Sequence, residues 1–256
     1  MKEKIYENTC CPWKEQLVWY EIINSTNTQA KHLAKEGAPH GTVLIADSQS
    51  AGRGRMGRQF DSQKGVGIYL SVILRPQSPP DRLMHLTCAA GVAMCDAVEK
   101  VTGIRPGIKW INDLVLDNRK LGGILTELSV DTATGLTEYA VIGIGINCNR
   151  QVFPPELQSI ATSLPHVDRA VLAGAMIDTL YDMDRQLDRK EAVMGRYRKD
   201  CVTLGKAVTV HRADGVLQGQ AMDLDADGGL IVSLAEGGTI TVSAGEVSVR
   251  GLYGYI

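Results

Sequence analysis

A short segment rich in glycine and arginine carries the residue types best suited to holding an anion. Residues 49–60 read Q-S-A-G-R-G-R-M-G-R-Q-F, in which Gly52, Gly54 and Gly57 alternate with Arg53, Arg55 and Arg58. Glycine lets the backbone turn tightly and approach a ligand closely. Arginine offers a permanently charged planar group that matches phosphate and carboxylate oxygens. The segment therefore predicts a loop that closes over an anion.

The same glycines form a G-x-G-x-x-G pattern, which raises the alternative of a dinucleotide-binding oxidoreductase. That fingerprint directly follows an apolar strand and opens a helix. Here the preceding residues 47–51 read D-S-Q-S-A, and residues 58–67 show no helical start. The context therefore argues against a dinucleotide site. A plain solvated loop with incidental arginines is the remaining alternative for this segment taken alone.

Two lysines flank a second group of polar residues. Residues 109–113 read K-W-I-N-D and residues 120–125 read K-L-G-G-I-L, on either side of a turn at residues 117–119. A lysine on a strand is most often solvated. Two lysines and an acid beside a double glycine, within otherwise apolar strands, are more typical of a site for phosphate and a metal ion.

A third polar group precedes a helical pattern near the N-terminus. Residues 24–28 read N-S-T-N-T, and the residues that follow have helical spacing up to Gly37. The hydroxyl groups of Ser25 and Thr26 are good helix caps. The free N–H groups of a helix N-terminus also suit a polar ligand head. The sequence alone leaves both roles open.

Apolar patterns predict the elements that must position these groups. Strands are expected over residues 17–20, 42–46 and 66–74. One hairpin is expected over residues 109–128, and a second hairpin is expected to follow it, with a strand over residues 139–146. Helices are expected up to Gly37, from residues 79–81 to Gly103, from 168 to about 190 and on to about 201. Gly143 and Gly145 inside the last strand predict close approach by another backbone or by a ligand.

The pattern changes after residue 204. Short apolar runs alternate with turns at Asp214-Gly215 and at residues 227–229, a spacing typical of a small all-β barrel. We therefore expect two domains, a catalytic domain over residues 1–202 and a β-barrel over residues 203–256.

Composition narrows the class of protein. The chain has 256 residues, of which 44% are hydrophobic and 22% charged, and its net charge of −2 argues against a general nucleic-acid surface. Its six cysteines show no zinc spacing, and its first residues form no signal sequence. No apolar run approaches the length of a membrane span. A reduced, cytoplasmic protein without membrane contact is expected.

The motifs, taken in order, closely resemble those of the biotin protein ligases. They are S-T-N at 25–27, the Gly/Arg segment at 49–58, K-W-I-N-D at 109–113, K-L-G-G-I-L at 120–125 and G-I-G-I-N at 143–147. G-E-V-S-V-R at 245–250 resembles the end of that family's small C-terminal domain. The resemblance covers about residues 17–255. It implies an α+β fold with a mixed, mostly antiparallel sheet and packed helices, like that of class II aminoacyl-tRNA synthetases, followed by an SH3-like β-barrel.

The resemblance implies a two-step, AMP-forming ligase reaction. Biotin and ATP with Mg²⁺ give biotinyl-5′-AMP and pyrophosphate, and the biotinyl group then passes to a lysine of a biotin carboxyl carrier protein or carboxylase domain. The chemistry agrees with the residues, because an attack that joins two anions requires positive charge and the exclusion of water.

By this resemblance each motif has an expected role. Biotin is expected at Ser25, Thr26, Asn27, Gln49, Lys120 and Gly123, and the nucleotide at Arg53, Gly54, Arg55, Asn112 and Asn147. The expected catalytic residues are Lys120, Lys109, Asp113 and Arg55. Lys120 would bridge the biotin carboxylate and the α-phosphate, Lys109 would neutralise the triphosphate, and Arg55 would also retain the adenylate. No dedicated metal site is expected, and Mg²⁺ would arrive with ATP, held through waters by Asp113.

Two positions depart from the family pattern, and two other functions compete with the ligase. The family usually has proline at Ile111 and tryptophan at Phe60; both replacements stay apolar. A lipoate or octanoate ligase of the same architecture and a non-catalytic biotin-binding module are the alternatives, and the retention of both lysines argues against the latter. Too few residues precede residue 17 for a DNA-binding domain, so no DNA binding is expected. A homodimer through an exposed sheet edge is compatible with the resemblance.

Overall fold

A seven-stranded, mostly antiparallel sheet organises the chain. The computed structural model describes residues 1–212, 215–243, 246–249 and 252. The strand order is β1-β2-β3-β7-β6-β5-β4, and the neighbouring strands pair antiparallel except for β1 and β2. The strands are β1 (Leu17–Ile23), β2 (Thr42–Gln49), β3 (Gly67–Leu74), β4 (Gly107–Lys109), β5 (Asp113–Leu116), β6 (Arg119–Val130) and β7 (Thr137–Asn147).

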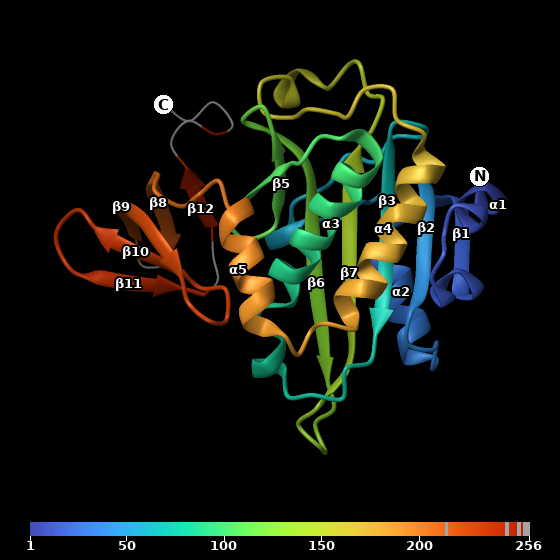
Figure 1. The fold of residues 1–256 in the computed structure, drawn as a ribbon, viewed down its shortest axis with the longest axis horizontal. Coiled ribbons are helices and arrows are strands. Elements are labelled where there is room, and N and C mark those ends of the chain that lie inside the picture. Colours follow the sequence, from blue (N-terminus) through green and yellow to red (C-terminus); the bar gives the residue numbers. More distant parts are fainter. Residues whose placement is uncertain (213–214, 244–245, 250–251, 253–256) are drawn as a thin grey trace.

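Helices cover both faces of this sheet. Helices α3 (Leu86–Thr102) and α4 (Arg169–Asp184) lie across one face, with α5 (Lys190–Asp200) beside α3 (Figure 1). Helix α2 (Thr26–Lys35) lies on the opposite face, where its alanines pack with Leu44, Ile73 and Val141. The next residues of those strands face α3 and α4, because successive side chains of a strand point to opposite sides. Helix α1 (Lys2–Glu7) packs beside α4.

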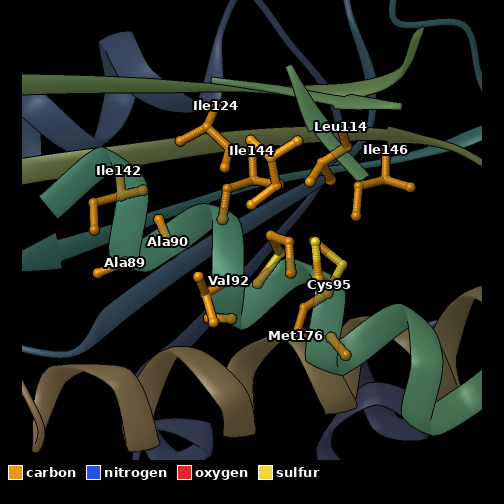
Figure 2. Packing of buried hydrophobic residues seen from close by; sticks show 14 of the residues in the cluster. Ala89, Ala90, Val92, Cys95, Leu114, Ile124, Ile142, Ile144, Ile146 and Met176 are labelled. Carbon is orange, nitrogen blue, oxygen red and sulfur yellow. The ribbon is translucent and has the colours of Figure 1, made fainter. Parts of the chain in front are cut away.

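Helix α3 lies at the centre of the core. Eleven of its residues are buried, most of them small, which matches a helix covered on several sides. Figure 2 shows it running between the isoleucine side chains of β6 and β7 and helix α4, whose Met176 packs against it. This packing holds β6 and β7 in place, and both strands contribute residues to the cavity described below.

The helix boundaries differ from the predictions at two places. The helix expected to begin at residues 79–81 begins at Leu86, because the prolines open only a short 3₁₀ turn (Pro80–Leu83) before it. It ends as predicted at Gly103, which adopts φ 72. The helix expected up to about residue 190 ends at Asp184, and a new helix, α5, begins at Lys190.

A second sheet of five antiparallel strands follows. Its order is β11-β10-β9-β8-β12, with the strands β8 (Ala207–Arg212), β9 (Gly215–Leu224), β10 (Leu230–Leu234), β11 (Thr239–Val242) and β12 (Glu246–Val249). It lies beside α5 (Figure 1). The predicted turn residue Asp214 and the motif ends Gly245 and Arg250 lie outside the described residues. The predicted fold class, a mixed α+β domain with a small C-terminal β domain, is confirmed. None of the described helices is both long enough and apolar enough to cross a membrane.

Candidate active site

One cavity collects nearly all the residues singled out by sequence. It opens between the Gly/Arg loop and the ends of β6 and β7, and Trp110, Phe60 and Val247 contribute apolar walls. Of the expected site residues, those that line it are Ser25, Thr26, Asn27, Gln49, Arg53, Gly54, Arg55, Lys109, Asn112, Asp113, Lys120 and Gly123.

The end of the cavity beside α2 is built from buried neutral side chains. Ser25 is the N-cap of α2, where its hydroxyl accepts a hydrogen bond from the Thr28 N–H (3.4 Å). The side-chain oxygen of Gln49 accepts from the Thr26 N–H at 2.8 Å. Ser25, Thr26 and Asn27 are each at most 4% exposed. The capping role of Ser25 is therefore present, and the same turn also lines the cavity.

The amide of Asn27 is held on both sides. Its oxygen accepts from the Ser71 hydroxyl at 2.6 Å. Its Nδ2 donates to the Leu125 carbonyl at 3.2 Å and to the Glu127 carboxylate at 3.1 Å. Because every one of these groups is occupied, the amide is fixed in one orientation before any ligand arrives.

The interior glycines of β7 make room for two of these side chains. A Cβ at residue 143 would lie 1.8 Å from Asn27 Oδ1, and one at residue 145 would lie 2.5 Å from the Phe60 ring. The side chains of Asn27 and Phe60 therefore approach these glycines closely, and both glycines also line the cavity.

The opposite end of the cavity is charged. Lys109 at the end of β4 is 9% exposed. Lys120 and Asp113, on the hairpin of β5 and β6, form an ion pair of 2.7 Å between Nζ and Oδ1. The tight turn of that hairpin places Asp117 and Asn118 at φ 50 and 58, a conformation that Asp and Asn tolerate well. The peptide bond between Trp110 and Ile111 is cis.

The loop arginines reach toward different ends. Arg53 Nη1 donates to the Glu127 carboxylate at 3.1 Å, near α2. Arg55 Nη1 donates to the side-chain oxygen of Asn112 at 3.1 Å, near the lysines. The loop closes on itself through the Gly54 N–H, which donates to the Arg58 carbonyl at 2.7 Å. Among the described residues, the lining therefore carries five basic side chains and one carboxylate, that of Asp113.

Asn147, which was expected to contact the nucleotide, is not among the residues that line this cavity. Its amide is buried and donates to the Thr162 carbonyl at 3.1 Å. Strand β7 ends at Asn147, the last residue of the G-I-G-I-N motif, and both the side chain and the carbonyl of Asn147 hydrogen-bond to the loop of residues 148–165.

Several residues at the site were missed by sequence reasoning. Ser71 and Glu127 lie on strands and hold Asn27; a lone serine inside the apolar strand of residues 67–74 was the available signal. Trp110 is held by the turn between β9 and β10 of the second sheet, because its indole N–H donates to the Gly228 carbonyl at 2.8 Å. Val247 lies on β12, more than 100 residues after the other residues that line the cavity. Nothing in the sequence near Val247 indicates that it reaches this site.

The described residues contain no cluster of three or more His, Cys, Asp or Glu side chains that could hold a metal ion. Among the described residues, Asp113 supplies the one carboxylate in the lining, and it pairs with Lys120.

Comparisons with known proteins agree with this geometry. The sequence pattern of the Biotin/lipoate A/B protein ligase family matches residues 19–147, and that of the biotin protein ligase C-terminal domain matches residues 203–250. The Bacillus subtilis (strain 168) protein named bifunctional ligase/repressor BirA is 34% identical over 233 residues, which are 87% of this chain and 71% of that one. The Mycobacterium tuberculosis protein named biotin--[acetyl-CoA-carboxylase] ligase is 34% identical over 87% of this chain and 85% of its own length.

A solved structure matches the fold as well. The biotin protein ligase from Aquifex aeolicus, in complex with biotin and ATP, has a TM-score of 0.77 and 29% identity, over 91% of this chain and 98% of that one. The chain belongs to the biotin/lipoate A/B protein ligase family. Within it, the chain is an ATP-dependent biotin protein ligase, and the predicted family, enzyme class and substrates are confirmed.

Proposed function

We propose that the cavity binds biotin at its neutral end and ATP at its lysine end, and joins them there. The observation that carries this assignment is that one cavity combines a buried polar end, held by hydrogen bonds within the protein, with a lining that carries two lysines at the other end and three arginines of the loop. The ureido head of biotin is neutral and polar, whereas both its carboxylate and the triphosphate are anions. The two ends of the cavity match these two kinds of group.

At the neutral end, Ser25, Thr26, Asn27 and Gln49 are the proposed partners of the ureido head. Their positions are set by hydrogen bonds within the protein, so little reorganisation accompanies binding. Gly123 and the ring of Phe60 border the space for the aliphatic chain. This assignment names the residues of this chain that are proposed to recognise biotin.

At the lysine end, the biotin carboxylate attacks the α-phosphate of ATP and pyrophosphate leaves. Lys120 is the proposed residue that bridges the two anions, which requires it to exchange its Asp113 partner for the substrates. Lys109 neutralises the remaining phosphates, and Asn112 with Asp113 orients them together with Mg²⁺. Fixed positive groups aimed at developing charge are the largest single contribution in many such reactions.

In the second step, a lysine amine of the acceptor attacks the carbonyl carbon of biotinyl-5′-AMP, an amide forms and AMP leaves. The biotin ligase family acts on biotin carboxyl carrier proteins, and we propose a carrier protein or carboxylase domain as the acceptor here. Arg53 and Arg55 are proposed to cover the adenylate until the acceptor arrives, because both emerge from the loop that borders the cavity.

Three broader assignments accompany this proposal. The division into a catalytic domain, residues 1–202, and a C-terminal domain, residues 203–256, is supported by the two separate sheets. A homodimer through the open edge of β1 is supported by its place at the end of the sheet, and sedimentation of the purified protein tests it. A cytoplasmic location is supported by the six cysteines, which are all unpaired in the structure, and is tested by cell fractionation.

Biotin-dependent exchange of pyrophosphate into ATP tests the proposed site. The purified protein is expected to catalyse exchange with biotin and not with lipoate. Exchange with lipoate alone would keep the mechanism and overturn the substrate assignment at the α2 end. Biotin binding without exchange would instead favour a regulatory module that binds biotin without activating it.

A further inference from the structure

Glu127 on β6 belongs to none of the motifs, yet three side chains converge on its carboxylate. Lys31 Nζ lies 2.7 Å from Oε1, Asn27 Nδ2 donates to Oε2 at 3.1 Å, and Arg53 Nη1 lies 3.1 and 3.2 Å from the two oxygens. These partners come from helix α2 and from the Gly/Arg loop. One carboxylate therefore connects three separate parts of the chain.

The environment keeps this group ionised. The Glu127 side chain is 21% exposed, and this burial raises its pKa. Hydrogen bonds from Lys31 and Asn27 and the charges of Lys31 and Arg53 outweigh burial and hold the pKa below its usual value. The negative charge is therefore present across the neutral pH range.

Glu127 does not itself line the cavity, but two of its partners do. Asn27 lies at the neutral end, and Arg53 belongs to the loop that borders the opening. Lys31, the third partner, is not among the lining residues. Any effect of Glu127 on the substrates must therefore act through Asn27 and Arg53.

We propose that Glu127 is a positioning residue that orients the Asn27 amide for biotin and anchors Arg53 of the loop at the same time. The inference rests on the proposed site. It means that the biotin end and the loop over the adenylate share one anchor. Loss of the charge weakens both biotin binding and retention of biotinyl-5′-AMP, while the lysines that carry the first chemical step stay in place.

The test uses Glu127→Gln, which keeps the size of the side chain and removes its charge. We expect the KM for biotin in pyrophosphate exchange to rise about tenfold and biotinyl-5′-AMP to dissociate about tenfold faster, the size expected when a buried donor loses a charged partner. The kcat at saturating biotin is expected to change less than about twofold, because Lys120 and Lys109 are untouched.

Two control variants separate positioning from general stability. Lys31→Gln removes the partner that does not line the cavity, and it is expected to change the biotin KM and adenylate dissociation much less than Glu127→Gln does, because Asn27 and Arg53 keep their contacts with the carboxylate. Glu138→Gln removes an exposed carboxylate on the neighbouring strand β7, and it is expected to behave like the wild type. A lower melting temperature in Glu127→Gln without a change in KM or in dissociation would overturn the proposal.

Glu127→Asp provides a second, independent variant. It retains the charge but withdraws the carboxylate by one methylene, which weakens the hydrogen bond to Asn27 more than the longer-range attraction to Arg53 and Lys31. We expect a raised biotin KM with adenylate retention closer to the wild type than in Glu127→Gln. Equal retention defects in both variants would show that the charge is not the anchor. Absence of biotin-dependent exchange in the wild type would instead refute the proposed site, so the two failures are distinguishable.

Discussion

The two ends of the cavity are prepared for their ligands in different ways. At the α2 end, neutral groups are buried and mutually hydrogen-bonded, and Asn27 is held by Ser71, Leu125 and Glu127. At the lysine end, cations hold partners within the protein: Lys120 forms an ion pair with Asp113, and Arg55 donates a hydrogen bond to the Asn112 side chain. In the proposed reaction, the first end keeps its contacts when biotin binds, whereas the second exchanges them for contacts with the substrates.

In the proposed function, this difference assigns specificity to the α2 end and catalysis to the lysine end. A site whose polar groups are fixed and buried rejects ligands that cannot complete its hydrogen bonds. A site whose cations hold internal partners can release them to a ligand of higher charge. Variants at the two ends should therefore alter different kinetic constants.

The largest expected effect lies at the lysine end. Lys120→Ala is expected to lower the kcat of biotin-dependent pyrophosphate exchange by about 10²–10³, the cost of removing one preorganised donor at developing charge. The KM for biotin is expected to change little, because the α2 end is intact. Steady-state exchange kinetics measure both constants, with Lys100→Ala, an exposed lysine at the end of α3, as the matched control.

An unchanged kcat in Lys120→Ala would contradict the division between the two ends. It would transfer the bridging role to Lys109, the more buried of the two lysines. The Lys109→Ala variant would then carry the larger loss.

The second effect lies at the α2 end. A Cβ at residue 143 would lie 1.8 Å from Asn27 Oδ1, so Gly143→Ala must displace that amide. We expect the affinity for biotin to fall about 10²-fold, the size known for misplacements of about 1 Å in active sites. Calorimetric titration with biotin measures it, and ATP binding is expected to persist. Gly195→Ala, at a helical glycine with open space around it, is the control. Wild-type affinity for biotin in Gly143→Ala would show that Asn27 does not contact biotin.

The sequence predicted the local features of the cavity better than its contacts between distant segments. Local patterns were sufficient for the strands, the Ser25 cap and the Lys109–Lys120 hairpin, because caps, turns and apolar periodicity act over a few residues. The start of α3 was predicted too early, since proline opens a 3₁₀ turn as readily as a helix.

The parts that could not be predicted depend on contacts between distant segments. Glu127 receives Asn27 from 100 residues away, and Val247 reaches the cavity from the second sheet. Asn147 was expected at the nucleotide because it ends a motif, but its side chain faces the 148–165 loop. The direction of a side chain at a strand end depends on the neighbouring loop, which carries no local signal.

The smallest of the three effects separates the two loop arginines. Arg55 is held by Asn112 at the lysine end, whereas Arg53 is held by Glu127 at the other end. Arg55→Gly is expected to form biotinyl-5′-AMP but to release it about tenfold faster, which is the lower range for loss of a charge-assisted hydrogen bond. Released adenylate should then label lysines of bystander proteins.

Stopped-flow dissociation measures the release rate, and labelling of added serum albumin reports the escaped adenylate. Asn112→Ala, which leaves Arg55 in place but removes the oxygen that accepts its hydrogen bond, is expected to give a smaller increase. Dissociation at the wild-type rate in Arg55→Gly would assign retention of the adenylate to Arg53 and to its anchor at Glu127. Biotin binding and adenylate retention would then both depend on the α2 end.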